Sequence, residues 1–232
     1  MPPTRAVVLL SGGLDSSTCL AIALSKGRDV LALTVDYGQR HRKEISAAKA
    51  VAKRLGVKEH KILKVDLAQF GGSALTDERI GVPTGRTEKE IGRGIPPTYV
   101  PARNTVLLSL AIAYAEAAGA DEVYIAANFL DYSGYPDCRP EFFAIFREVA
   151  RLGTKRGVEG RPTRIHTPLI RTRKADIVRT GAKLGVPFGL TWSCYHGRAK
   201  ACGVCDSCKL RLKGFREAGL EDPLPYETPP KG

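Results

Sequence analysis

A strand–turn–helix pattern near the start of the 232-residue chain limits the fold more than any other feature. Residues 7–10 are four consecutive apolar residues, which predicts a buried strand, and the residues after 17 predict a helix. Gly12 and Gly13 lie between them and permit a close approach of the backbone to a ligand. Because the first turn of a helix has N–H groups without intrahelical partners, this turn predicts a phosphate or pyrophosphate site.

The motif differs from the two common phosphate-binding turns. It does not end in the Gly-Lys-Ser/Thr of the P-loop, and it is not the dinucleotide fingerprint Gly-x-Gly-x-x-Gly. An ordinary strand-to-helix turn also contains glycine, but it does not require three serines, two glycines and an aspartate in seven residues. The string SGGLDSS resembles SGGxDS, the signature of the PP-loop ATP pyrophosphatases. The resemblance implies that ATP is cut between its α and β phosphates and that a substrate is adenylated.

Composition indicates the broad class. The length suits one large α/β domain, and contents of 43% hydrophobic and 26% charged residues are typical of a soluble globular protein. No stretch approaches the roughly eighteen apolar residues of a membrane span, and the first residues have no apolar signal core, so we expect a cytoplasmic protein without a membrane partner. A net charge of +12 favours anionic partners such as nucleotides, carboxylates or RNA, although solvated lysines and arginines give the same balance.

Strands and helices alternate along the chain. The predicted strands are residues 5–10, 30–37, 61–67, 122–128 and 165–170. The predicted helices run from the turn to about 25, then over 41–55, 105–118, 140–152, 172–181 (or to 185) and 206–218, and residues 68–103 are irregular. This order predicts a Rossmann-like parallel sheet with helices on both faces. The resemblance of the turn implies that the fold is of the PP-loop (adenine nucleotide alpha hydrolase-like) type. We expect residues 1–190 to form one ATP-dependent PP-loop domain and residues 191–232, which contain four of the six cysteines, a small C-terminal segment packed on it.

Ligands of parallel sheets bind beyond the carboxyl ends of the strands, so residues 36–39 are expected to border the same crevice as the turn. Val35 and Tyr37 are candidate adenine neighbours, although a tyrosine at a strand end is more often plain packing. Arg103, beside a helix N-terminus, suits a clamp on phosphate or carboxylate oxygens. An equally good interpretation makes Asn104 the helix N-cap and leaves Arg103 in solvent. Lys174 is a candidate polyphosphate contact, with a solvated surface lysine as its alternative.

The predicted ATP site gathers these positions. Its members are Leu10, Ser11, Gly12, Gly13, Leu14, Asp15, Ser16, Ser17, Val35, Tyr37, Arg103 and Lys174. Mg²⁺, which accompanies ATP as the co-substrate, is expected on Asp15 with several waters retained.

A second informative string follows the fourth predicted strand. Residues 131–142 read DYSGYPDCRPEF, and this string after an SGGLDSS turn is similar to the QueC family of 7-cyano-7-deazaguanine synthases. A guanine-like base presents N1–H and an exocyclic amine on one edge, which a carboxylate can accept. We therefore expect Asp131 or Asp137 to bind that edge and Tyr132 or Tyr135 to stack on the ring. With these four, Arg139 completes the predicted substrate-binding residues.

Four of the six cysteines lie within fifteen residues, as Cys194, Cys202, Cys205 and Cys208. Such density in a cytosolic protein indicates a metal site, and four thiolates suit one structural zinc ion. An iron–sulfur cluster is the alternative, but the C-x3-C-P continuation of ferredoxins is absent. The resemblance also implies zinc. Cys138 is a weak candidate for a nucleophile, and His196, although it lies among the cysteines, is expected to play no part.

The resemblance implies a ligase that converts 7-carboxy-7-deazaguanine and ammonia to 7-cyano-7-deazaguanine through an adenylated acid and an amide, in queuosine biosynthesis. It also implies a homodimer, and no stable nucleic acid complex is expected. Two other classes remain. A tRNA-thiolating PP-loop enzyme fits the basic charge but needs an RNA-binding module or a catalytic cysteine pair, neither of which is evident. A non-enzymatic nucleotide- or RNA-binding zinc module predicts no pyrophosphate release.

Overall fold

The computed structural model describes residues 3–91, 93–130 and 134–227. A five-stranded sheet lies at its centre in the order β3-β2-β1-β4-β5, and every neighbouring pair is parallel. The strands are β1 (Arg5–Leu9), β2 (Asp29–Asp36), β3 (Glu59–Lys64), β4 (Glu122–Tyr124) and β5 (Arg164–His166). The predicted α/β class with a parallel sheet is therefore confirmed.

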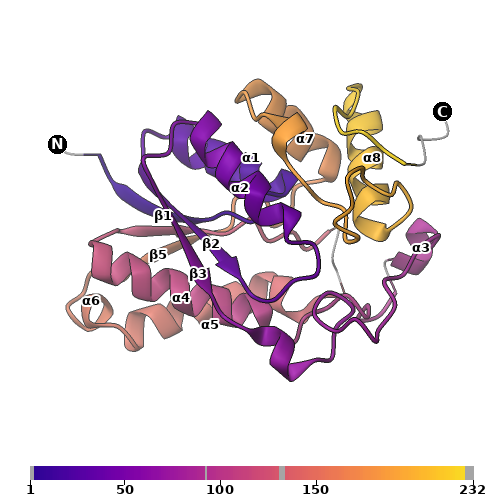
Figure 1. Cartoon of the computed structure of the whole chain (residues 1–232). Helices are drawn as coiled ribbons and strands as arrows, with labels where there is room; N and C mark the ends of the chain where they lie inside the picture. Colours follow the sequence, from indigo (N-terminus) through magenta and orange to yellow (C-terminus); the bar gives the residue numbers. More distant parts are fainter. Residues whose placement is uncertain (1–2, 92, 131–133, 228–232) are drawn as a thin grey trace.

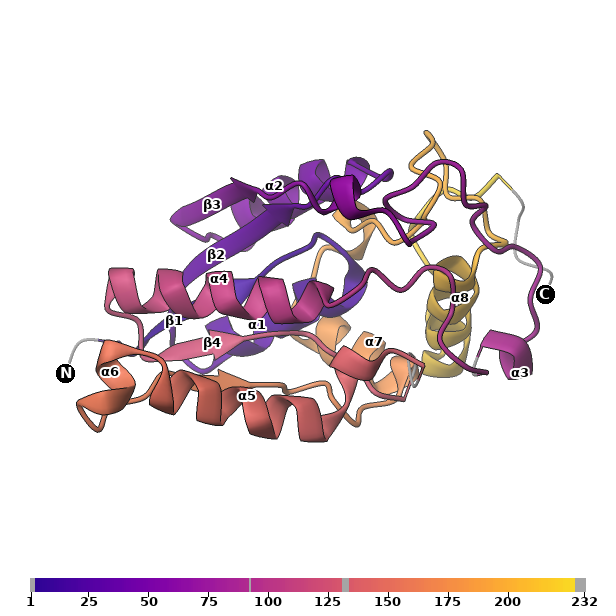
Figure 2. The same cartoon turned by 90° about the horizontal axis from the view of Figure 1, so that it is seen from below.

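Helices cover both faces of the sheet (Figure 1). One face carries α1 (Leu14–Ser25), α2 (Lys43–Arg54) and α7 (Lys174–Lys183). Figure 2 looks onto the other face, which carries α4 (Arg103–Ala118), α5 (Pro140–Leu152) and the short α6 (Lys155–Val158). The last helix, α8 (Asp206–Ala218), packs along α7, and the short α3 (Glu88–Ile91) lies near it. Among the described residues, no helix combines the length and the apolar character that a bilayer span requires.

The sheet separates two hydrophobic cores. Along β1 the side chains alternate, so that Val7 and Leu9 belong to the core beneath α4 and α5 while Ala6 and Val8 belong to the core beneath α1 and α7. All four are at most 7% exposed. A strand buried on both faces explains why this part of the sequence is a continuous apolar run rather than an alternating one.

The strands β4 and β5 are shorter than predicted, with three residues each instead of 122–128 and 165–170. Beyond Tyr124 the two segments stay connected, because the N–H of Ile125 donates to the His166 carbonyl at 3.0 Å and Asn128 Nδ2 donates to the carbonyls of Leu169 at 3.1 Å and Thr172 at 2.7 Å. Residues 125–128 also line a cavity. The strand β3 also differs, since it spans 59–64 rather than 61–67.

The helix α4 begins at Arg103, two residues earlier than predicted, and follows Ala102, whose φ of 52° is in the left-handed region. Asn104 is thus inside the helix and 5% exposed, so the interpretation of Asn104 as the N-cap is wrong. Its side chain is used for tertiary contacts instead. Among the described residues of the irregular 68–103 segment, α3 and the end of a 3-10 helix (Leu67–Phe70) precede the first residue of α4, and Thr84 forms an isolated bridge with Cys205 next to α8.

Candidate active site

A cavity of about 220 Å³ opens at the carboxyl ends of β1, β2 and β4. Most of the predicted ATP residues line it, and so does one predicted substrate residue. These are Leu10, Ser11, Gly13, Leu14, Asp15, Ser16, Val35, Tyr37, Arg103, Lys174 and Tyr135. The crevice expected from the strand order therefore brings together positions up to 164 residues apart, from Leu10 to Lys174.

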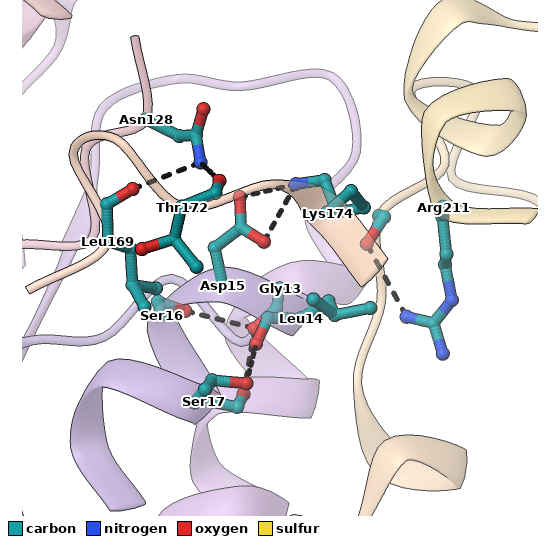
Figure 3. A network of polar contacts seen from close by, with 12 residues as sticks. Gly13, Leu14, Asp15, Ser16, Ser17, Asn128, Leu169, Thr172, Lys174 and Arg211 are labelled. Atoms are coloured by element: carbon teal, nitrogen blue, oxygen red, sulfur yellow. Dashed lines mark hydrogen bonds and ion pairs between the residues drawn. The ribbon is translucent and has the colours of Figure 1, made fainter. Parts of the chain in front are cut away.

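The glycine–serine turn between β1 and α1 is held by its own hydroxyls (Figure 3). Ser16 Oγ lies 3.0 Å from Ser11 Oγ and donates to the Gly13 carbonyl at 3.1 Å. Gly12 has a φ of +87°, and a Cβ there would lie 2.3 Å from the Glu44 carbonyl oxygen. Only glycine fits at this position, because a side chain would both strain the backbone and collide with the start of α2.

Two of the predicted turn residues face away from the cavity. Ser17 is fully buried, and its Oγ donates to the Gly13 carbonyl at 2.8 Å. Gly12 is buried as well, and its carbonyl accepts from the Trp192 N–H at 2.9 Å. Neither residue is among those that line the cavity. Their part in this site is to hold the shape of the turn.

Lys174, the first residue of α7, reaches the turn from the other side (Figure 3). Its Nζ donates to both carboxylate oxygens of Asp15, at 2.8 and 2.7 Å. The two side chains are 10% and 19% exposed. Lys174 is therefore part of the cavity wall and not a solvated surface lysine. A cation and a carboxylate lie side by side where the helix N-terminus already favours anions.

Arg103 also lines the cavity, with its guanidinium carbon 5.8 Å from the centroid of the Tyr37 ring. Its Nε is buried and has no hydrogen-bond partner among the described residues. Burial raises the pKa of Tyr37 to about 12, so that this phenol is neutral near pH 7. A partly buried guanidinium with donor capacity left over is suited to a carboxylate or phosphate.

The substrate loop is only partly described, because Asp131 and Tyr132 lie outside the described residues. Asp137 is 4% exposed and does not line the cavity, and its Oδ2 accepts from the Asn104 N–H at 2.9 Å. Its Oδ1 has no partner among the described residues. Arg139 is exposed and is not among the residues that line the cavity, so this structure does not bring it to the site.

Two further residues of this loop line the cavity. Tyr135 is 4% exposed, and its hydroxyl lies 2.9 Å from Thr98 Oγ1. Cys138 is also buried, and burial raises the pKa of its thiol to about 12. Because the thiolate is the nucleophilic form, a thiol with this pKa is a poor nucleophile at neutral pH. The structure therefore speaks against Cys138 as a nucleophile.

Several cavity residues were not singled out from the sequence. Arg211 of α8 is 2% exposed, forms a two-point ion pair with Asp222 at 2.7 and 2.9 Å, and donates to Thr191 Oγ1 at 2.7 Å. The other unpredicted members include His41, Glu44, Asn128, Ser193 and Tyr195. Their positions depend on how α2, α4 and the C-terminal segment pack, and a single sequence gives no local signal for that.

The four cysteines form a second, separate site. Cys194, Cys202, Cys205 and Cys208 are all buried, and their sulfurs lie within 4.8 Å of one another. Sγ atoms at the corners of a tetrahedron around zinc would be about 3.8 Å apart, given Zn–S bonds of about 2.3 Å. The Sγ atoms of Cys202 and Cys208 are 3.9 Å apart, and Cys202 Sγ also accepts from the N–H of Cys205 at 3.3 Å. The cluster therefore fits a tetrahedral metal ion.

Comparison with known proteins agrees with this geometry. A family model described as "Queuosine biosynthesis protein QueC" matches residues 5–219. The chain belongs to the QueC family. It is 58% identical over 223 residues to "7-cyano-7-deazaguanine synthase" of Anaeromyxobacter dehalogenans, which covers 96% of this chain and 95% of that one. It is 55% identical to the protein of the same description from Trichormus variabilis, over 96% of this chain and 98% of that one.

Solved structures are less similar. The NMN synthetase from Francisella tularensis superposes with a TM-score of 0.49 at 17% identity, over 95% of this chain and 79% of that one. A 4-thiouridine synthetase–RNA complex with bound ATP gives a TM-score of 0.49 at 15% identity, over 93% of this chain and 50% of that one. The resemblance suggested by the SGGLDSS turn and the DYSGYPDCRPEF loop is confirmed by the family match alone.

Proposed function

We propose that this chain is an ATP-dependent ligase that converts 7-carboxy-7-deazaguanine and ammonia to 7-cyano-7-deazaguanine in queuosine biosynthesis. The observation that carries the proposal is the QueC family match over residues 5–219, together with 58% identity to a curated 7-cyano-7-deazaguanine synthase over nearly the full length of both chains. The cavity contains three features that such chemistry needs: the glycine–serine turn for the phosphates, the ammonium group of Lys174, and a cleft at the carboxyl ends of parallel strands.

ATP binds with its polyphosphate on the turn between β1 and α1. Support comes from the hydroxyls of Ser11 and Ser16 and the N-terminus of α1, which face the cavity together. Val35 and Tyr37 line the part of the cavity next to β2 and serve as the adenine neighbours. Ser17, Gly12 and Leu14 support the turn. Lys174 supplies positive charge for the phosphates.

Mg²⁺ would be held by Asp15, phosphate oxygens and water, since the Asp15 carboxylate lines the cavity beside the phosphate-binding turn and Mg²⁺ is usually bound by one or two carboxylates together with substrate phosphates. The ion would neutralise phosphate charge and leave pyrophosphate a better leaving group. Arg103 is placed to hold an oxygen of the α-phosphate or of the substrate carboxylate. Both roles use the same donor groups.

The reaction requires a carboxylate to become electrophilic. A carboxylate oxygen attacks the α-phosphorus of ATP, the bond to pyrophosphate breaks, and the acyl adenylate forms. Ammonia then attacks the acyl carbon and AMP leaves, which gives the amide. The amide oxygen then attacks the α-phosphorus of a second ATP and pyrophosphate leaves. The C–O bond breaks, AMP leaves with that oxygen, and the nitrogen loses its two protons to water, which gives the nitrile. In this scheme the chain contributes positioning and charge stabilisation, and no protein nucleophile is needed.

The substrate base is bound by residues of one loop, with Asp131 or Asp137 at its N1–H edge and Tyr132 or Tyr135 on its ring. Asp137 keeps one buried oxygen without a partner among the described residues, which is consistent with an acceptor for ring N–H donors. Asn substitution of each aspartate discriminates between them. The variant that raises the KM for the acid at least tenfold, with the KM for ATP unchanged, identifies the residue that binds the base edge. Arg139 is the weakest member of the predicted set because its side chain is exposed.

The cysteine cluster holds one structural zinc ion. Four buried thiolates leave no open position for a substrate, and the cluster lies between α8 and the segment that carries Thr84. Metal analysis of protein purified without added metal is expected to give one zinc ion per chain and no acid-labile sulfide.

We also propose that the protein is cytoplasmic, since all six cysteines are unpaired and a reducing compartment keeps them so.

A homodimer is supported by an apolar stripe on the outer face of α5. Ile145, Val149 and Leu152 are 67%, 50% and 66% exposed and recur at spacings of four and three. Val149→Glu is expected to convert a dimer to a monomer in sedimentation analysis, whereas Leu220→Glu, an exposed position outside the stripe, leaves it dimeric.

A gel shift with bulk tRNA is expected to detect no stable complex at physiological salt, and a steeply salt-dependent shift would instead support the tRNA-modifying alternative.

The decisive experiment mixes the protein with MgATP, ammonium and 7-carboxy-7-deazaguanine and follows the products by mass spectrometry. We expect the nitrile, with AMP and pyrophosphate. Asp15→Asn is expected to abolish it, and the matched control Asp29→Asn, at the far end of β2 and paired with Arg5, is expected to keep wild-type activity. ATP cleavage that depends on a different acid would refute the proposed substrate.

A further inference from the structure

A second, small cavity lies next to the active site. It has a volume of about 10 Å³, about the space of one water molecule. Tyr135 and Tyr195 line both cavities, and Arg86 and Asp206 line the small one with them. Arg86 does not line the main cavity and has no part in the chemistry described so far. An arginine in this place can affect the substrate only through the residues that line the main cavity.

Arg86 forms a buried ion pair with Asp206, the first residue of α8. Its Nε donates to Asp206 Oδ1 at 3.2 Å, and its Nη2 donates to Oδ2 of the same carboxylate. The side chains of Arg86 and Asp206 are 21% and 5% exposed. A two-point contact between a guanidinium and a carboxylate fixes the orientation of the guanidinium as well as its position. The pair therefore determines how residue 86 lies relative to α8.

Further contacts join this part of the chain to the cysteine-rich segment. The N–H of Gly85 donates to the Val204 carbonyl at 3.1 Å, and Lys209 Nζ donates to the Arg86 carbonyl at 2.5 Å. The helix α3, which follows Arg86, lies near α8 (Figures 1 and 2). The backbone around Arg86 is thus held by the segment that carries the proposed zinc ion.

The residues that hold Tyr135 come from the same irregular segment. Thr98 Oγ1 lies 2.9 Å from the Tyr135 hydroxyl, and the centroid of the Tyr99 ring lies 5.6 Å from that of Tyr135. A Cβ on Gly134 would lie 2.0 Å from the Gly94 carbonyl oxygen, so the backbones of the two segments are in direct contact there. The position of Tyr135, which is 4% exposed, therefore depends on how residues 84–99 are anchored.

We propose that Arg86 is a positioning residue for the substrate: it holds Tyr135 where its ring stacks on the base. The proposal rests on the proposed function, in which a tyrosine of this loop stacks on a 7-deazapurine. It selects Tyr135, which lines the main cavity. Stacking requires a defined distance and angle between the rings, so it weakens when the tyrosine ring is free to move. Arg86, fixed on α8 through Asp206, limits that movement from the side of the small cavity.

The test measures acid-dependent exchange of pyrophosphate into ATP, without ammonium, at varied concentrations of the acid and of ATP. The variants are Arg86→Met, Tyr135→Leu and the two combined, and the zinc content and melting temperature of each are measured. Arg79→Met is the matched control. Arg79 belongs to the same irregular segment, but its side chain is 88% exposed and pairs with Asp77, two residues away.

A second variant guards against misfolding. Arg86→Met leaves the Asp206 carboxylate buried without a cation, which can destabilise the fold. Arg86→Met combined with Asp206→Asn removes both charges, so no buried charge is left unpaired. This variant carries the test if Arg86→Met alone does not fold.

We expect Arg86→Met and Tyr135→Leu each to raise the half-saturating concentration of the acid about tenfold, within the range of base–aromatic stacking. The half-saturating concentration of ATP should stay within about twofold of wild type. The combined variant should exceed Tyr135→Leu by less than about twofold, because an arginine that acts through the ring has no effect once the ring is absent. Arg79→Met should match wild type in both concentrations.

Three results would overturn the role of Arg86. One is an unchanged half-saturating concentration of the acid in either single variant. Another is a combined variant in which the two effects multiply, since Arg86 would then act independently of Tyr135. The third is loss of zinc, or an equal rise for ATP, in the folded Arg86 variants, because the pair would then support the fold in general. Wild-type protein without acid-dependent exchange would instead refute the proposed function itself.

Discussion

Gly214 connects the C-terminal helix to the ATP site, and its substitution tests the geometry of that site. A Cβ at position 214 would lie 2.3 Å from Lys174 Cγ and 3.2 Å from Lys174 Cβ. The α7 and α8 backbones are thus close enough that only glycine leaves room for the lysine stem. Lys174 in turn donates to both oxygens of Asp15. We predict that Gly214→Ala impairs ATP use by displacing Lys174.

The size of the effect follows from the distances. Carbon atoms in favourable contact are about 3.5–4.0 Å apart, so the two groups must separate by about 1.2 Å or more. Overpacking of this kind typically destabilises by about 1–3 kcal/mol, and a displacement of about 1 Å in an active site can lower activity about 100-fold. We therefore expect kcat/KM for ATP to fall between about 10-fold and 100-fold, with a smaller loss of stability.

A double-mutant cycle in the pyrophosphate exchange assay checks this mechanism. Lys174→Ala removes Cγ, so Gly214→Ala in that background should change the rate by less than about twofold. Gly189→Ala is the matched control, because its added Cβ would lie 3.7 Å from the nearest atom, an ordinary contact. Additive losses in the double variant, or full activity of Gly214→Ala, would refute the reasoning.

Three further predictions follow from other parts of the chain. Burial would raise the pKa of Glu122, but hydrogen bonds from Arg28 and Arg164 outweigh it and lower this pKa to about 2. The carboxylate should therefore contribute fully to the stability of the fold above its unfolded pKa of about 4.3, and this contribution should be lost as the pH falls toward 2. Glu122→Gln should lower the free energy of unfolding by about 3 kcal/mol at pH 7 in urea titrations, and it should weaken the dependence of that free energy on pH below about 4.3. Removal of the metal by a chelator, or Cys205→Ser, should lower the melting temperature and release one zinc ion per chain, and unchanged melting after complete metal loss would contradict a structural role. Cys138→Ser should keep at least a third of kcat, since the buried thiol is protonated at neutral pH, and loss of all activity without loss of ATP binding would reopen a chemical role for it.

Sequence patterns predicted those elements whose conformation depends mainly on residues close together in the chain. The apolar run before Gly12, the serines after it and the cysteine spacing each depend on neighbouring residues, so the turn, the helix α1 and the cysteine cluster could be predicted from the chain itself. The alternation of strands and helices likewise predicted the parallel sheet, because a parallel connection needs a crossover. Recognition of the QueC family needed only two short strings.

The tertiary structure decided which side chains meet. The strands β4 and β5 are shorter than the apolar runs that predicted them, and Arg139 is exposed although its neighbour Cys138 lines the cavity. Gly214 lies against Lys174 because α8 packs on α7, and Arg211 of the same helix lines the cavity. Helices and turns form through contacts between residues a few positions apart, so a sequence pattern can predict them. The side chains that meet in the cavity come from segments tens to hundreds of residues apart, and their meeting depends on packing between those segments, which no local pattern predicts.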